Sequence, residues 1–173
     1  MWKVLTQNFF EQEAEMVARE LLGKFLCRQQ FGNRVPKCLM ITEVEAYVGP
    51  QDKASHAHRG KTARNFPMFG EAGRWYVYFT YGMHWMLNIV AEPKDYPAAV
   101  LIRAVEGISG PARLTKKLKI DERFNNKKAL PKIGLWIENR GFKIKKHKIK
   151  RLPRVGVDYA GKWAKKPLRF LLK

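Results

Sequence analysis

Three runs of residues that favour β-strands constrain the fold of this chain more than any other feature. Residues 38–48 alternate in character and are rich in β-formers, which predicts a strand. Residues 74–91 predict a β-hairpin with its turn near residues 80–82. Residues 98–105 are apolar apart from Arg103 and predict a further strand. Because strands dominate and only a few helices accompany them, we expect the α+β class.

Two helices are expected beside these strands. Apolar side chains recur at helical spacing through residues 8–23, with Asn8 suited to cap the start and Gly23 to end the helix. A Gly-Pro pair precedes a short basic helix over residues 112–119, since proline suits the first helical position. The Gly- and His-containing segment 49–73 is a loop that is too long to serve only as a connection.

Length and cysteine content limit the class of protein. The 173 residues suit one domain over 1–173, which we expect to hold a curved antiparallel sheet, a protruding β-hairpin and surrounding short helices. No stretch approaches the roughly 18 apolar residues of a membrane span, and no signal peptide is evident. Cys27 and Cys38 cannot form a disulfide framework or a CxxC metal site. We therefore expect two free thiols and a cytoplasmic protein.

Positive charge is concentrated in the last third of the chain. The whole sequence has 34 Lys and Arg against 15 Asp and Glu, a net charge of +19. Residues 111–173 alone hold 21 basic and 4 acidic side chains, whereas residues 41–110 hold 7 of each. A protein this basic binds polyanions, and nucleic acid is the first candidate. An anionic membrane surface is the second, but no helix is both amphipathic and basic.

Two charged side chains interrupt the predicted strands. Glu45 lies near the end of its strand beside Tyr47, where desolvation would raise its proton affinity and make it a candidate general base. Glu43 competes for this role, and a plain salt bridge is the alternative for both. Arg103 must find a partner, because an unpaired buried charge is costly, so it either orients a carboxylate or water or forms a structural pair. Alternation places one set of side chains on a single strand face: Leu39, Ile41, Glu43, Glu45 and Tyr47.

The hairpin is unusually aromatic. Tyr76, Tyr78 and Thr80 share one face, and Tyr81 lies at the tip. A large aromatic beside a turn glycine is poorly placed for a core and well placed to be pushed between bases. Tyr78 and Tyr47 could supply walls on which a planar base stacks. The alternative is that these tyrosines only pack in a core.

The remaining polar residues exclude several chemistries. His56, His58 and His84 have no nearby cysteine, so a zinc site is not expected. Asn88 lies among apolar residues and must be hydrogen-bonded, and it could limit what fits in a pocket. Residues 152–157 are similar to a DNA-binding helix-hairpin-helix hairpin, but their flanks are not helical. Phosphate-binding and nucleophile-elbow motifs are absent from the sequence.

Several long motifs together match one family. The sequence resembles the 3-methyladenine DNA glycosylases of the alkyladenine, mammalian-like type over nearly its whole length. The motifs that carry the resemblance are Thr42–Tyr47, Thr62, Arg64, Asn65, Met68, Phe69, Tyr76–Tyr78, Tyr81–Met83, Asn88, Leu101–Ala104, Arg154, Gly156, Val157, Tyr159–Gly161 and Trp163.

The resemblance implies a monofunctional DNA glycosylase that starts base excision repair. Such an enzyme flips a damaged nucleotide out of double-stranded DNA and lets water attack C1′, which leaves an abasic site. The implied bases are alkylated or deaminated purines: 3-methyladenine, 7-methylguanine, hypoxanthine and etheno-adenine. The resemblance implies a monomer without metal or cofactor, nucleoid-associated in a bacterium and nuclear in a eukaryote.

The same resemblance assigns the reaction and the flipping to three residues. Glu45 matches the general base that deprotonates the water. Arg103 matches the residue that holds this water and the carboxylate. Tyr81 matches the wedge that fills the space left by the flipped base.

The pocket and the DNA backbone are assigned in the same way. Tyr47, His56 and Tyr78 match the stacking walls, Asn88 matches the residue that disfavours the 2-amino group of guanine, and Tyr76 matches a neighbouring position. We expect weaker backbone contacts from Arg64 and from three residues near a helix N-terminus, where phosphate binding is favoured: Arg113, Lys116 and Lys117. The competing hypothesis is a non-catalytic nucleic-acid-binding protein, which would not need Glu45.

Overall fold

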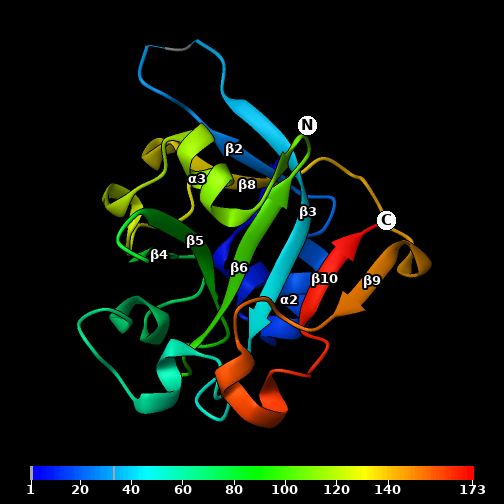
Figure 1. The fold of residues 1–173 in the computed structure, drawn as a ribbon. Coiled ribbons are helices and arrows are strands. Elements are labelled where there is room, and N and C mark those ends of the chain that lie inside the picture. The colour runs from blue at the N-terminus through cyan, green and yellow to red at the C-terminus, as the bar shows by residue number, and fades with distance from the viewer. Residues whose placement is uncertain (1, 33) are drawn as a thin grey trace.

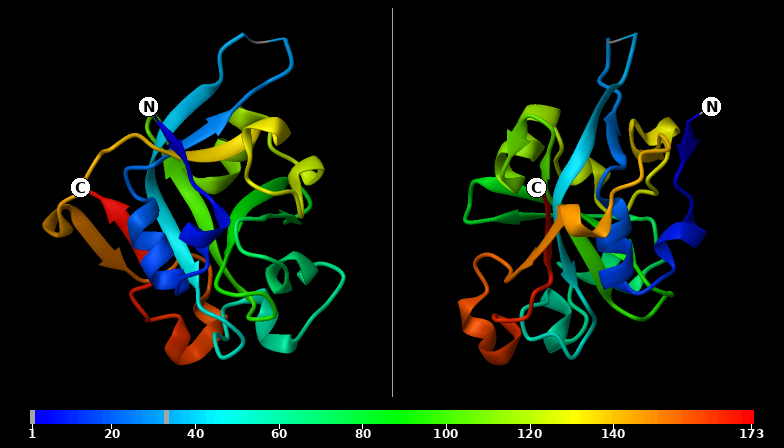
Figure 2. Two further views of the ribbon diagram at one scale, coloured as in Figure 1. Left: turned by 180° about the vertical axis from the view of Figure 1, so that it is seen from behind. Right: turned by 90° about the vertical axis from the view of Figure 1, so that its right-hand side faces the viewer.

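One curved antiparallel sheet carries the fold of residues 2–32 and 34–173, the part of the chain that the computed structural model describes (Figures 1 and 2). The main path runs β1-β8-β2-β3-β6-β5-β4, while β7 pairs with β6, and β10 pairs with both β3 and β9. The strands are β1 (Lys3–Val4), β2 (Phe25–Arg28), β3 (Lys37–Tyr47), β4 (Trp75–Thr80), β5 (His84–Ala91), β6 (Ala98–Val105), β7 (Ile108–Ser109), β8 (Leu135–Asn139), β9 (Ile149–Leu152) and β10 (Arg169–Leu172).

Strand β3 lies at the centre of this arrangement. It pairs with β2 through residues 37–40, with β6 through residues 41–47 and with β10 through residues 43–45. Its second half, which carries both glutamates, is therefore held by β6 and β10 together. Such a position gives side chains on β3 a fixed backbone.

Short helices surround the sheet: α1 (Gln7–Phe10), α2 (Ala14–Leu21) and α3 (Pro111–Leu118), together with several 3₁₀ turns. Helix α2 packs against β3 and β6, and Figure 2 shows it covering β3 when the molecule is seen from behind. Helix α3 packs against β5 and β6. The α+β class with a curved antiparallel sheet and short helices is confirmed. No helix in the described residues has the length and apolar character to span a membrane.

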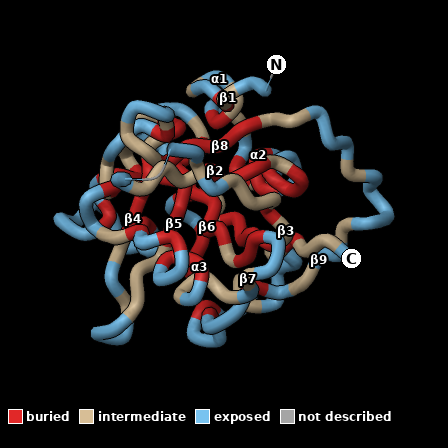
Figure 3. The backbone as a smooth tube through the Cα atoms, turned by 90° about the horizontal axis from the view of Figure 1, so that it is seen from above, coloured by how far each residue is buried: buried red, intermediate tan, exposed pale blue. Residues whose placement is uncertain are grey.

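The hydrophobic core lies between the sheet and these helices. Figure 3 shows buried residues gathered along β5, β6 and β8, with exposed residues at the periphery. The apolar stripe of α2 meets the apolar side of β3 and β6, as helical and strand periodicities require. Representative members are Val17, Leu21, Val44, Val100 and Ile102, each with no exposed surface.

The three strand-rich predictions are confirmed. The predicted strand 38–48 is β3, the predicted hairpin 74–91 is β4 and β5, and the predicted strand 98–105 is β6. Helix α3 begins at Pro111 after Gly110, whose φ of 93° allows the sharp entry into the helix.

The single helix predicted over residues 8–23 is wrong at its start. The chain forms α1 and then leaves the helical path at Glu11 before α2 begins at Ala14. The cause is a contact with a distant loop, because the Glu92 carboxylate accepts from Ala14 N at 3.1 Å and Glu92 N donates to Phe10 O at 2.9 Å. Glu92, and not Asn8, therefore satisfies the first amide of α2. Gly23 follows the end of α2 with φ +82°, as predicted.

The predicted common face of β3 is also wrong in part. The register with β6 shifts between Ile41 and Glu43 and again between Glu43 and Val44. Ile41 consequently packs in the same core as Val44 and Ala46 instead of sharing a face with Glu45. A local bulge of this kind redirects side chains, and it leaves the polar end of β3 free to face a cavity.

The prediction of two free thiols is wrong. Cys27 on β2 lies directly opposite Cys38 on β3, and a disulfide joins them. The two Cα atoms are 4.0 Å apart because the strands pair in this register, which sequence spacing alone does not show.

Candidate active site

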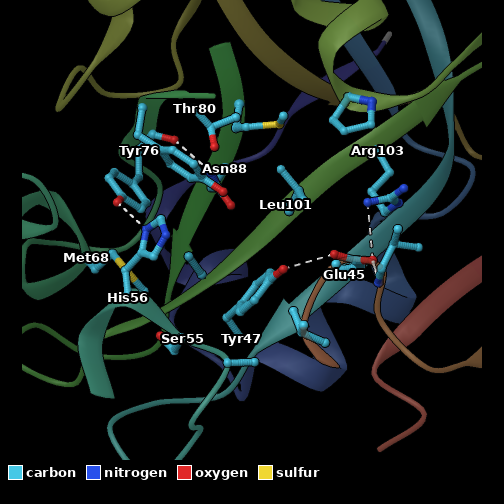
Figure 4. Close-up of a pocket in the computed structure, with 18 of the residues that line it drawn as sticks. Glu45, Tyr47, Ser55, His56, Met68, Tyr76, Thr80, Asn88, Leu101 and Arg103 are labelled. Atoms are coloured by element: carbon cyan, nitrogen blue, oxygen red, sulfur yellow. Dashed lines mark hydrogen bonds and ion pairs between the residues drawn. The ribbon is translucent and has the colours of Figure 1, made fainter. Parts of the chain in front are cut away.

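A pocket of about 320 Å³ opens on the face of the sheet that carries the polar end of β3. Three strands supply its floor and walls, and two loops close its sides, as Figure 4 shows. The loop before the 3₁₀ turn His56–Arg59 closes one side, and the loop after β9 closes the other. The predicted residues that line the cavity are Glu45, Tyr47, His56, Tyr76, Tyr78, Tyr81, Asn88 and Arg103.

Glu45 lies at the floor of the pocket with no exposed surface. Val155 N donates to Glu45 Oε1 at 2.8 Å, and the Tyr47 hydroxyl donates to Oε2 at 3.0 Å. Arg103 Nη1 lies 3.3 Å from Oε1. Three groups from three separate segments therefore fix one carboxylate.

Burial raises the pKa of the Glu45 carboxyl above its usual range, and the nearby Arg103 charge and the Val155 amide partly oppose this effect. A carboxylate with a raised proton affinity that is still hydrogen-bonded in its charged form is suited to accept a proton. The simple strand-end salt bridge is thus not the whole role of this residue.

Arg103 connects the two glutamates of β3. Its Nε donates to Glu43 Oε1 at 3.0 Å, while its Nη1 faces Glu45. Glu43 also accepts from Arg169 Nη1 on β10 at 3.0 Å. Because both of these contacts occupy Glu43, it is a counter-ion that orients Arg103, and Glu45 is the carboxylate beside the cavity.

Aromatic rings form the walls. The Tyr76 and Tyr78 rings are 5.1 Å apart, and the His56 ring meets Tyr78 edge-on at 4.6 Å. The Tyr47 ring stands beside Glu45 at the other end of the cavity (Figure 4). Burial raises the pKa of Tyr78 to about 12, and it raises the pKa of Tyr47 and Tyr76 as well, so all three phenols are neutral near pH 7.

His56 is held as a neutral ring. Its Nδ1 lies 2.8 Å from the Tyr76 hydroxyl, and Asn65 Nδ2 donates to the His56 carbonyl at 2.9 Å. Desolvation and then the Arg64 charge lower the pKa of His56 to about 4. The surface of His56 counts as exposed because it faces the open cavity, but the packed Tyr78 and Tyr76 rings justify the direction of the shift.

Asn88 and Tyr81 occupy opposite ends of the hairpin. Asn88 is buried on β5, and its Nδ2 donates to the Tyr76 carbonyl at 3.1 Å. Tyr81 lies at the tip with 79% of its surface exposed. Its φ of 52° is unusual for a tyrosine, and such backbone strain clusters at functional positions.

The predicted backbone contacts fall into two groups. Arg64 lies 5.1 Å from the centre of the Tyr78 ring and donates to the Phe79 carbonyl at 2.8 Å, so it braces the hairpin. Arg113, Lys116 and Lys117 are exposed along α3. Only Arg113 is near the helix N-terminus, because Lys116 and Lys117 lie in the last turn, which corrects the predicted reason for their phosphate binding.

The sequence analysis missed three residues of the site. Asp52 and Arg154 form a buried ion pair beside the pocket, and Val155 supplies the amide that binds Glu45. The segment 152–157 was compared with a helix-hairpin-helix hairpin, but it is the turn that follows β9. The available signal was an arginine among apolar residues.

A basic protein with a fixed carboxylate beneath an aromatic pocket has the features of an enzyme that acts on a planar group of a polyanion. Comparison with known proteins specifies the class. The family model for methylpurine-DNA glycosylase matches residues 8–110 and 107–173. The chain therefore belongs to the methylpurine-DNA glycosylase family, and the resemblance seen in the motifs is confirmed.

Curated relatives agree with this assignment. A protein of Methanocella arvoryzae is 43% identical, covering 96% of this chain and 91% of its own length. A protein of Anaeromyxobacter dehalogenans is 42% identical, with 98% and 83% covered, and one of Legionella pneumophila is 40% identical, with 98% and 94% covered. Each of the three carries the name "Putative 3-methyladenine DNA glycosylase".

Proposed function

We propose that this chain is a monofunctional DNA glycosylase that excises alkylated and deaminated purines from double-stranded DNA. The observation that carries the proposal is the carboxylate of Glu45, which is fully buried at the floor of a base-sized aromatic pocket and held by Val155 N, Tyr47 and Arg103. A purely binding protein has no need to bury a carboxylate where it faces a bound base, because the cost of its desolvation would be uncompensated.

Access to the bond requires the nucleotide to leave the duplex. A purine in a stack hides C1′ from water, so the damaged nucleotide enters the pocket and its base stacks among Tyr47, His56 and Tyr78. Tyr81 at the hairpin tip then fills the vacated space. The exposed cations of α3 grip phosphates without reading sequence.

The reaction is a hydrolysis. Water held between Glu45 and Arg103 attacks C1′, Glu45 accepts its proton, and the bond from C1′ to the purine nitrogen breaks with its electron pair leaving on the base. A methylated purine is cationic and leaves as a neutral base without an acid. Hypoxanthine and etheno-adenine leave more readily when a neutral donor, such as a pocket phenol, hydrogen-bonds them.

The proposal specifies no lyase step. Strand cleavage by a glycosylase of the lyase type needs an amine that forms a Schiff base at C1′. No lysine is among the described residues that line the cavity. We also propose that the enzyme acts as a monomer, since one chain supplies Glu45, Arg103 and the pocket walls.

A single-turnover assay tests the function. Labelled duplexes with one 7-methylguanine or one hypoxanthine are incubated with the wild type, Glu45→Gln and the control Glu122→Gln, which changes an exposed glutamate. After alkali, the wild type and the control should yield cleaved strands, and Glu45→Gln should be slower by at least about 100-fold. Without alkali, the strands should stay intact.

Three outcomes would contradict the proposal. Strand breaks without alkali would show a lyase. Equal rates for Glu45→Gln and the wild type would remove Glu45 from the reaction. Tight binding of lesion DNA without cleavage of any substrate would favour the non-catalytic nucleic-acid-binding protein.

A further inference from the structure

A buried ion pair lies directly behind the pocket. Asp52, in the loop after β3, meets Arg154, in the loop after β9, through two contacts: Nη1 to Oδ2 at 2.5 Å and Nη2 to Oδ1 at 2.8 Å. Both side chains have no exposed surface. In the sequence the two residues are 102 positions apart.

Each member of the pair also fixes backbone around it. Arg154 Nη1 donates to the Ala46 carbonyl at 2.9 Å, and the guanidinium lies 4.7 Å from the centre of the Tyr47 ring. Asp52 accepts from Val48 N at 3.2 Å and from Ala54 N at 3.0 Å. One ion pair thus joins the end of β3, the loop that leads to His56 and the loop that follows β9.

The arrangement is costly for a purely structural contact. Replacing a buried ion pair by apolar side chains of similar volume is often neutral or stabilising. Here the bidentate geometry also leaves Arg154 Nε as the buried side-chain atom without a hydrogen-bond partner in the described residues. A specific geometric requirement next to the pair would explain its presence.

That requirement is the amide of the next residue. Val155 N donates to Glu45 Oε1 at 2.8 Å, although Val155 itself is half exposed and has little packing to hold it. Because the peptide unit is planar, fixing Arg154 also fixes the direction of the Val155 N–H. We propose that the Asp52–Arg154 pair is a positioning element that aims the Val155 amide, and with it the Tyr47 hydroxyl, at the Glu45 carboxylate.

The inference rests on the proposed function, since it assigns Glu45 the role of a base. The charged and titratable groups that face Glu45 come from every element around it: Tyr47 and Glu43 on β3, Arg103 on β6, Tyr78 on β4, and Arg154 after β9. Arg169 on β10 acts through Glu43. Among these, only the Val155 amide and the Tyr47 hydroxyl are hydrogen-bond donors without charge, and the ion pair holds both.

The test uses Arg154→Lys, which keeps the charge but loses the two-pronged grip. Loss of the aimed amide removes a hydrogen bond to the charged form of Glu45, so the pKa of Glu45 should rise. The acidic limb of the single-turnover pH–rate profile should move up by about one unit, which slows cleavage about tenfold below the limb. Above the limb, the rate should return to within about threefold of the wild type.

Hydrogen exchange of the Val155 amide gives a readout that is independent of activity. We expect at least about tenfold faster exchange of this amide in Arg154→Lys and in Asp52→Asn, measured by NMR. The matched control is Arg123→Lys, which makes the same change in the exposed bidentate pair of Asp121 and Arg123. The control should alter neither the profile nor the exchange.

The outcomes separate the two proposals. A wild type that cleaves no lesion would reject the proposed function, and the amide exchange would still decide the positioning role. A lower melting temperature in Arg154→Lys with an unmoved pH limb and unchanged Val155 exchange would show a merely structural pair and overturn the inference. If Arg154→Lys does not fold, unchanged Val155 exchange in Asp52→Asn would overturn it as well.

Discussion

His56 should stay neutral far below the pH at which histidine usually titrates, because its pKa is lowered to about 4 by desolvation and by the Arg64 charge. A lowered pKa in the folded state contributes stability above pH 6.5, and this contribution is lost as the pH falls toward 4. The difference of about 2.5 units corresponds to about 3.4 kcal/mol for a fully buried ring.

This figure must be reduced because the His56 surface faces the open cavity. Allowing for solvent screening, we expect about 1–2 kcal/mol of acid-dependent destabilisation from this residue. In a chain of 173 residues that amounts to a fall in melting temperature of roughly 2–8 °C between pH 6.5 and 4.

The assay is a comparison of His56→Gln with the wild type and with His147→Gln, which removes an exposed histidine. Melting temperatures measured across this pH range should fall less steeply for His56→Gln than for the other two proteins. NMR titration of the ring should place the midpoint of His56 near pH 4. A midpoint near pH 6.5, or identical pH slopes for all three proteins, would refute the reasoning.

Three further predictions concern stability and DNA binding. Glu45→Gln should melt no lower than the wild type at pH 7, since burial raises the pKa of Glu45 and disfavours its charged form there; a clear loss in thermal unfolding would contradict this. Changing Lys145, Lys146 and Lys148 together to Gln should lower the salt dependence of DNA binding by up to roughly three units of slope if each contacts a phosphate, with bound-state cleavage unchanged; fluorescence titrations at several salt concentrations measure it. Cys38→Ser should destabilise the protein by about 2–3 kcal/mol in denaturant melts without altering cleavage, because the disulfide closes a loop of 11 residues away from the pocket.

The sequence predicted those parts of the site that local pattern determines. Glu45 and Arg103 were conspicuous because each is a charge within a β-rich run, and strand pairing brings their side chains together. The hairpin placed Tyr76 and Tyr78 on one face by simple alternation, and both line the pocket. The family motifs, and not the spacing, supplied the roles of these residues.

What could not be predicted depends on contacts between distant segments. Asp52 and Arg154 are polar residues in loops, and no local pattern indicates that they meet. The disulfide depends on the register of β2 against β3, and the break between α1 and α2 depends on Glu92. The bulge in β3 likewise arises from its pairing with β6, so the alternation rule failed at Ile41.

The central position of β3 determines which partner moves during recognition. Glu45 is bound to a strand that is paired on β6 and β10, and its oxygens are already occupied by fixed donors. A carboxylate held in this way cannot travel toward its target. The whole displacement that brings C1′ to the carboxylate must therefore be made by the DNA, and the rate at which a nucleotide rotates out of the helix sets an upper limit on turnover.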